Sequence, residues 1–226
     1  MSDVTNIIII GAGSNIARNV FKENKNYEIN AFSKFSNIKS IKEYKSHHYD
    51  KTETIIKFIS KIKSKKIVLI FMESLSVSNL VINKTDQEML KEINANVIKP
   101  HKIIKKILPK MIKNNWGRII FSGSSRALKG DAGISGYSIS KHALVGYCKV
   151  LSKEYARFGI TTNYLSLGIF QSKLLNSLKK NTKKSIIDNT DTGSIGDYKS
   201  VYNAVHFIIN SKYVSGAIIP VNGGFN

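Results

Sequence analysis

Short apolar runs alternate along the whole chain with longer segments in which apolar residues recur at helical spacing. The short runs are typical of strands buried on both faces, and they predict strands at 4–10, 27–32, 46–49, 66–72, 117–122, 160–166 and 217–220. The longer segments predict helices at 14–22, 52–62, 86–113, 136–158 and 197–209. This alternation predicts an α/β fold: one doubly wound parallel sheet of about seven strands, with helices on both faces.

No repeat, linker or low-complexity segment divides the sequence, so we expect a single domain over 1–226. Residues 171–196 are polar, lysine-rich and weakly periodic, which is typical of a mobile substrate lid. The single Cys148 excludes an intramolecular disulfide and fits a reducing compartment. The apolar run Ile7–Ile10 is too short to span a bilayer and no export signal is visible, so we expect a cytoplasmic protein without membrane contact.

The formal net charge of +20 raises the question of nucleic acid binding. Only four residues are arginine, the side chain that binds phosphate or guanine with two donors, and the lysines are spread over the whole chain. We therefore expect no nucleic acid site but a solvated basic surface, with attraction for an anionic substrate or carrier as the alternative.

Tyr137 and Lys141 are four residues apart, so the phenol and the ammonium lie on one face of the predicted helix. A lysine cation stabilises phenolate, and we expect Lys141 to lower the pKa of Tyr137 from its usual value of about 10. Ser124 follows a predicted strand and supplies a hydroxyl that could hold a substrate carbonyl. Together these groups predict a site that protonates a substrate oxygen.

A glycine-rich sequence, Gly11-Ala-Gly-Ser-Asn-Ile-Ala17, follows the first predicted strand and opens a helix. In a Rossmann-like fold such a turn presents backbone N–H groups to a pyrophosphate. The predicted cofactor contacts in this turn are Gly11, Gly13, Ser14, Asn15 and Ile16.

The second predicted strand leads into Ser33 and Lys34 and carries no carboxylate. A carboxylate here would bind a ribose 2′-hydroxyl and repel a 2′-phosphate, whereas a hydroxyl and a cation favour the phosphate. We therefore predict NADP(H) as the cofactor in preference to NAD(H).

With the glycine turn, Ser124, Tyr137 and Lys141 in place, the chain resembles the short-chain dehydrogenase/reductase (SDR) family over nearly its whole length. It is most similar to compact soluble members such as the β-ketoacyl carrier-protein reductases. The resemblance implies a catalytic tetrad completed by Asn96, which fits the family spacing better than its neighbour Asn94. The further cofactor contacts that it implies are Asp50, Tyr137, Lys141, Gly168, Phe170 and Ser172.

The implied activity is hydride transfer between a nicotinamide and the carbonyl carbon of a keto-sugar, ketoacyl or similar substrate. Tyr137 would donate the proton, Ser124 would hold the oxygen, Lys141 would hold the nicotinamide ribose, and Asn96 would anchor a proton-relaying water. Four other hydroxyls compete with Ser124: Ser122, Ser125, Ser138 and Ser140. The five histidines have no metal-ligand spacing, and we expect no metal site.

The sequence departs from the family pattern at four places. Asn15 and Ala17 replace two glycines of the phosphate turn, Leu167 replaces a proline, and Phe71-Met-Glu-Ser74 replaces Asn-Asn-Ala-Gly. The last departure puts the charge of Glu73 near the cofactor ribose. It favours an alternative function, an SDR-fold protein that binds a cofactor with weak or no catalysis.

The predicted lid carries five lysines: Lys173, Lys179, Lys180, Lys183 and Lys184. They could attract an anionic substrate, such as a phosphorylated keto-sugar or an acyl chain on an acidic carrier protein. The family resemblance also implies a homodimer or homotetramer that assembles through the helices near 96–113 and 136–158.

Overall fold

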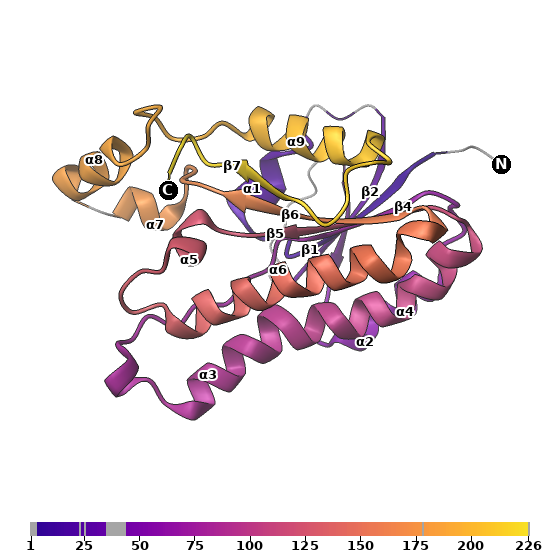
Figure 1. Ribbon diagram of the computed structural model, residues 1–226, viewed down its shortest axis with the longest axis horizontal. Helices are drawn as coiled ribbons and strands as arrows, with labels where there is room; N and C mark the ends of the chain where they lie inside the picture. The colour runs from indigo at the N-terminus through magenta and orange to yellow at the C-terminus, as the bar shows by residue number, and fades with distance from the viewer. Residues whose placement is uncertain (1–3, 23, 25, 35–43, 178, 226) are drawn as a thin grey trace.

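The computed structural model describes residues 4–22, 24, 26–34, 44–177 and 179–225, and shows a parallel sheet with helices on both faces (Figure 1). In this part of the chain seven strands pair in the order β3-β2-β1-β4-β5-β6-β7. The strands are β1 (Asn6–Ile10), β2 (Glu28–Ser33), β3 (Tyr44–His48), β4 (Ile67–Phe71), β5 (Gly117–Ser122), β6 (Ile160–Leu167) and β7 (Ile218–Val221). The predicted α/β fold is confirmed.

The helices follow the strands as the apolar spacing predicts, with three additions. The helices are α1 (Asn15–Asn19), α2 (Thr52–Lys61), α3 (Asp86–Ile93), α4 (Lys99–Lys113), α5 (Ser125–Lys129), α6 (Ser135–Tyr155), α7 (Lys173–Ser177), α8 (Lys180–Asp188) and α9 (Tyr198–Asn210). Short 3₁₀ turns lie at Val81–Asn83 and Ala156–Phe158. The sequence did not predict α5, α7 or α8, because each is short and has few apolar positions to set a period.

The sheet separates two hydrophobic cores, because successive side chains of a strand point to opposite faces. Ile8 and Ile10 of β1 pack with α2, α4 and α6 on one face. Ile7 and Ile9 pack with α1 and α9 on the other. All four isoleucines are at most 1% exposed, so the first strand is buried on both sides, as its continuous apolar sequence predicts.

The helices expected across 86–113, with Pro100 at a first turn or a bend, are present as α3 and α4, and a π-helical turn at Asn94–Ile98 lies between them. Pro100 has no backbone N–H, so the carbonyl four residues earlier, that of Asn96, cannot receive its usual helical hydrogen bond. The chain adjusts with a wider turn, in which the Lys99 N–H bonds to the Asn94 carbonyl. The Asn96 side chain is buried within this turn.

Residues 171–196, the predicted lid, contain two helices rather than an irregular loop. No described residue of α8 is buried, and in Figure 1 this helix extends beyond the end of the sheet. The base of the segment is attached to the body by hydrogen bonds from Gly196 N to Ile169 O (2.8 Å) and from Thr192 N to Gly223 O (3.1 Å). The side chain of Lys173 lies outside the described part of the structure.

Candidate active site

A cavity of about 420 Å³ opens at the carboxyl ends of β1, β2 and β4. The strand order reverses between β1 and β4, and ligands of doubly wound sheets bind at such a switch point. Residues from the glycine turn and from the ends of β2 and β4 line it, among them Gly11, Gly13, Ser14, Ser33, Lys34 and Glu73. The cavity therefore brings together the predicted phosphate turn and the predicted ribose contacts.

The glycine turn, of which Gly11, Gly13 and Ser14 line the cavity, leaves backbone donors free. In the described structure the N–H groups of Gly13, Asn15 and Ile16 have no intramolecular acceptor. The Ser14 hydroxyl is already used, because it accepts a hydrogen bond from Ala17 N at 3.1 Å and caps α1. The Asn15 amide donates to Gln171 O at 3.4 Å, so this departure from the family glycine connects the turn to the base of the lid.

The ends of β2 and β3 place three of the predicted residues differently. Ser33 is 1% exposed, whereas the Lys34 side chain is 53% exposed at the mouth of the cavity. Asp50 points away, with a side chain that is 82% exposed and 3.5 Å from the His48 ring. Its neighbour Tyr49 lines the cavity instead.

The carboxylate of Glu73, which follows β4, lines the cavity. Glu73 accepts hydrogen bonds from the Tyr49 hydroxyl and the Lys99 ammonium, and lies 3.6 Å from the Lys34 ammonium. Burial raises the pKa of Glu73, but the contacts with Lys99, Tyr49 and Lys34 outweigh it and hold the pKa below its usual value. Burial and the neighbouring carboxylate raise the pKa of Tyr49.

The Tyr137 phenol contacts two serine side chains. The hydroxyls of Ser124, from the start of α5, and Ser74, from the segment after β4, interact with the phenol and lower its pKa. Burial nevertheless raises the pKa of Tyr137, and the two serines offset only part of this rise. The prediction that Lys141 lowers this pKa is therefore wrong for this structure, because desolvation of the phenolate dominates.

Lys141 lies beneath the tyrosine ring. Its side chain is 2% exposed, with Nζ 5.4 Å from the Tyr137 ring centroid. Nζ donates a 2.8 Å hydrogen bond to the Ser122 carbonyl at the end of β5. Burial lowers the pKa of Lys141 to about 8.

Asn96 is fully engaged within the protein. Its Oδ1 accepts from Leu75 N, and its Nδ2 donates to Leu75 O, both at 2.8 Å. A further 2.9 Å bond reaches the Ser140 hydroxyl, next to Lys141 in α6. The side chain thus fixes the segment after β4 against α6, and its role in holding a water stays a prediction.

Among the competing serines, the described structure places Ser124 against the phenol. Ser125 bonds with Ser166 at 2.9 Å, Ser138 donates to Ala127 O, and Ser140 donates to Tyr137 O at 2.7 Å. The Ser124 turn is itself held by Tyr164, whose hydroxyl accepts from Ser124 N at 3.3 Å.

The segment after β6 is built mainly by backbone contacts. A Cβ on Gly168 would lie 2.5 Å from Asn222 Cα, so this position admits no side chain. Phe170 is 6% exposed and stacks on Tyr198 with ring centroids 6.4 Å apart. The Ser172 hydroxyl, just before α7, accepts from Leu175 N at 3.1 Å.

Three residues at the site escaped the sequence analysis: Ser74, Tyr49 and Lys99. Ser74 was seen only as part of a departure from the family pattern. Its contact with Tyr137 joins residues that are far apart in sequence, and no local period records such a contact. Lys99 follows Asn96 by three residues, and this helical spacing was the one sequence feature that could have placed Lys99 near the site.

The described residues include neither a cluster of metal ligands nor a helix suited to span a membrane. No group of three or more His, Cys, Asp or Glu side chains is arranged to hold a metal ion there. None of the described helices has the length and apolarity needed to cross a bilayer.

Comparisons with solved structures identify proteins of the same fold. "ElxO with NADP Bound" superposes with a TM-score of 0.86 at 22% identity and covers 98% of both chains. "YwfH, NADPH dependent reductase involved in Bacilysin biosynthesis" superposes with a TM-score of 0.89 at 20% identity, over 99% of this chain and 98% of that one.

Sequence comparisons reach curated proteins and a family. The 3-oxoacyl-(acyl-carrier-protein) reductase FabG of Pseudomonas aeruginosa is 28% identical over 160 residues, which are 70% of this chain but only 65% of that relative. The enzyme of the same name from Buchnera aphidicola subsp. Schizaphis graminum is 32% identical over 178 residues, 76% of this chain and 73% of the relative. A family model described as enoyl-(acyl carrier protein) reductase matches residues 57–226. Since both the model and the relatives match most of its length, the chain belongs to the short-chain dehydrogenase/reductase family.

Proposed function

We propose that this protein is an NADP(H)-dependent oxidoreductase that reduces a carbonyl group to an alcohol. The observation that carries the proposal is the meeting of the Tyr137 phenol with the Ser124 hydroxyl, directly above the buried ammonium of Lys141. The group lies at the carboxyl end of the sheet, as does the cavity of about 420 Å³.

The residues around the cavity fit a dinucleotide. The free N–H groups of Gly13, Asn15 and Ile16 are suited to a pyrophosphate, because they are unpaired donors at the start of a helix. Lys34 supports a 2′-phosphate at the end of β2. The names of two solved relatives, bound to NADP or dependent on NADPH, agree with this choice.

The chain's own residues supply the proton and hold the substrate oxygen. A bound nicotinamide supplies the hydride. Tyr137 is a phenol whose pKa burial raises, and it donates its O–H to the oxygen as negative charge develops there. Ser124 donates a second hydrogen bond to the same oxygen, and the cation of Lys141 stabilises the phenolate left behind.

The proposed substrate is a 3-oxoacyl thioester. The curated relatives carry the name of 3-oxoacyl reductases that use an acyl-carrier protein, and the exposed lysines of α8 suit an acidic carrier. A phosphorylated or nucleotide-linked keto-sugar is the second candidate, because the same cations would attract it.

The test is to follow the absorbance of NADPH with acetoacetyl thioesters, keto-sugars and simple ketones. We expect oxidation of NADPH with the thioester and a lower dissociation constant for NADPH than for NADH. NADPH binding without turnover of any carbonyl would instead support the cofactor-binding alternative, and failure to bind either nucleotide would refute both.

Self-association through α6 is part of this proposal. Ile139, Ala143, Gly146 and Val150 are exposed and recur at helical spacing, so they form an apolar stripe on this helix. Light scattering on the purified protein would detect the dimer or tetramer, and a mass equal to one chain would refute it.

A further inference from the structure

The carboxylate of Glu73 lies between two lysines that differ in their exposure to solvent. Lys99 is 11% exposed, bonds to Glu73 and holds its ammonium 4.4 Å from the Tyr49 ring centroid. Lys34, on the other carboxylate oxygen, is 53% exposed and 3.6 Å away. The inner contact is therefore built into the protein, whereas the outer cation can exchange its partner for another anion.

The backbone prevents Glu73 from moving away from the phosphate turn. Its N–H donates to Ile10 O at 3.0 Å, beside the bond from Met72 N to the same carbonyl at 2.7 Å. A Cβ on Gly11 would lie only 2.1 Å from Glu73 N, so the glycine turn and the segment after β4 are in direct contact. The carboxylate thus has a fixed place at the edge of the proposed adenosine site.

The charges of this cluster bear on the choice between the two cofactors. Two lysines and one carboxylate leave a net charge of one positive unit. Glu73 already offsets part of the positive charge of Lys34. A 2′-phosphate bound by Lys34 would be repelled by Glu73, whereas a 2′-hydroxyl could donate a hydrogen bond to an acidic side chain.

We propose that Glu73 limits the preference of this protein for NADP(H) over NAD(H), because its carboxylate competes with the ribose 2′-phosphate for Lys34. This inference rests on the proposed binding of NADP(H). Lys34 favours the phosphorylated cofactor, and Glu73, held from behind by Lys99 and Tyr49, reduces the margin of that preference.

The experiment measures dissociation constants of NADPH and NADH for the wild type and for Glu73→Gln, from the fluorescence of the bound dihydronicotinamide. Glutamine keeps the size of the side chain and removes its charge. We expect the ratio of the NADH constant to the NADPH constant to rise about fivefold at low salt, and the gain to shrink as salt screens the repulsion. 2′,5′-ADP and ADP, which lack the nicotinamide, should show the same change of ratio.

Glu154→Gln is the matched control, because it removes the same charge from an exposed site at the C-terminal end of α6. It should leave the ratio of the two dissociation constants unchanged. If Glu73→Gln does not fold, Glu73→Gln combined with Lys99→Met removes the buried pair together and should still raise the ratio. An unchanged ratio in a folded Glu73 variant would overturn the inference alone. A wild type that binds neither nucleotide would overturn the proposed function as well.

Discussion

The ammonium of Lys141 lies 5.4 Å from the centre of the Tyr137 ring and donates a hydrogen bond to the Ser122 carbonyl. One helical turn separates the two residues, and the carboxyl end of β5 closes the group from below. A buried cation beneath a buried phenol stabilises phenolate at the moment when the proton leaves, whereas burial raises the pKa of the resting phenol. The arrangement suits a proton donor.

Tyr137→Phe removes the proposed donor and keeps the ring. We expect kcat to fall by about 10²–10⁴-fold, the usual contribution of a positioned acid, while the dissociation constant of NADPH changes little. Stopped-flow absorbance and nucleotide fluorescence measure the two quantities. Tyr213→Phe, at a side chain that is 99% exposed, is the control. Unchanged kcat in Tyr137→Phe would exclude this residue as the acid.

The buried charge of Lys141 destabilises the folded protein to an extent that depends on pH. Its native pKa of about 8 lies below the unfolded value of about 10.4, so between these values the unfolded state binds more protons. Stability from this group therefore rises as the pH increases through that window. We expect the difference in unfolding free energy between wild type and Lys141→Met to move in favour of the wild type by about 3 kcal/mol.

Urea titrations at several pH values between about 7 and 10 measure this difference. Lys149→Met, at an exposed position of the same helix, is the control and should show no such trend. A difference for Lys141→Met that does not vary with pH would show that Lys141 titrates normally in the folded protein.

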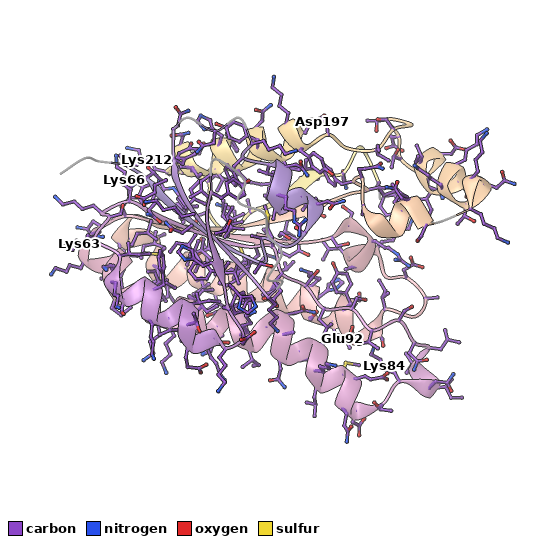
Figure 2. The ribbon with its side chains drawn as sticks, turned by 180° about the vertical axis from the view of Figure 1, so that it is seen from behind. Lys63, Lys66, Lys84, Glu92, Asp197 and Lys212 are labelled. Atoms are coloured by element: carbon purple, nitrogen blue, oxygen red, sulfur yellow. The ribbon has the colours of Figure 1, made fainter. Side chains whose placement is uncertain are left out.

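Lys84 and Glu92 form a second buried ion pair, away from the cavity and seen together in Figure 2. Nζ lies 2.7 Å from Oε2 with side chains 2% and 0% exposed, in a contact without hydrogen-bond alignment. The same groups bond to Val77, so the pair fixes the segment before α3. We expect Lys84→Met to cost about 3–5 kcal/mol, because it leaves a buried charge unpaired.

Chemical denaturation checks this loss, and Lys84→Met with Glu92→Gln should recover much of it by removing both charges. Lys45→Met breaks the exposed pair with Glu28, in which the side chains are 67% and 39% exposed, and should cost less than about 1 kcal/mol. Equal losses of unfolding free energy in Lys84→Met and Lys45→Met would contradict the expectation that breaking the buried pair costs more than breaking the exposed one.

The lysines of the lid provide a test of the substrate class. Lys179, Lys180 and Lys184 are exposed, and their replacement by glutamine should raise KM for a carrier-linked or phosphorylated substrate severalfold at low salt, with little effect at high salt. Steady-state kinetics at two ionic strengths measure this.

The control for the lid variants is a triple replacement at Lys63, Lys65 and Lys212, which are exposed lysines far from α8. Figure 2 shows Lys63 and Lys212 on the side of the molecule opposite to α8. The control removes the same charge and should leave KM unchanged. Equal effects of the two triple variants would mean that only the total charge matters.

The apolar runs and the glycine turn were sufficient to predict the sheet, because a strand buried on both faces needs a continuous apolar sequence and a parallel sheet needs helices between its strands. The helical spacing of Tyr137 and Lys141 likewise places both side chains on one face of α6 whatever the rest of the chain does. These features depend on neighbours in sequence.

Other features depend on contacts between distant segments. Ser124 and Ser74 come to Tyr137 from the ends of two different strands, and the burial that raises its pKa exists only in the packed site. Glu73 was visible as a departure from a family pattern, yet its partners Tyr49 and Lys99 come from the position just after β3 and from the start of α4. Local sequence therefore determined the sheet, the turn and the Tyr–Lys pair. Tertiary packing alone decided the direction of the pKa shift of the tyrosine and the contacts of the carboxylate, because desolvation and charge pairing are set by what surrounds a group in space.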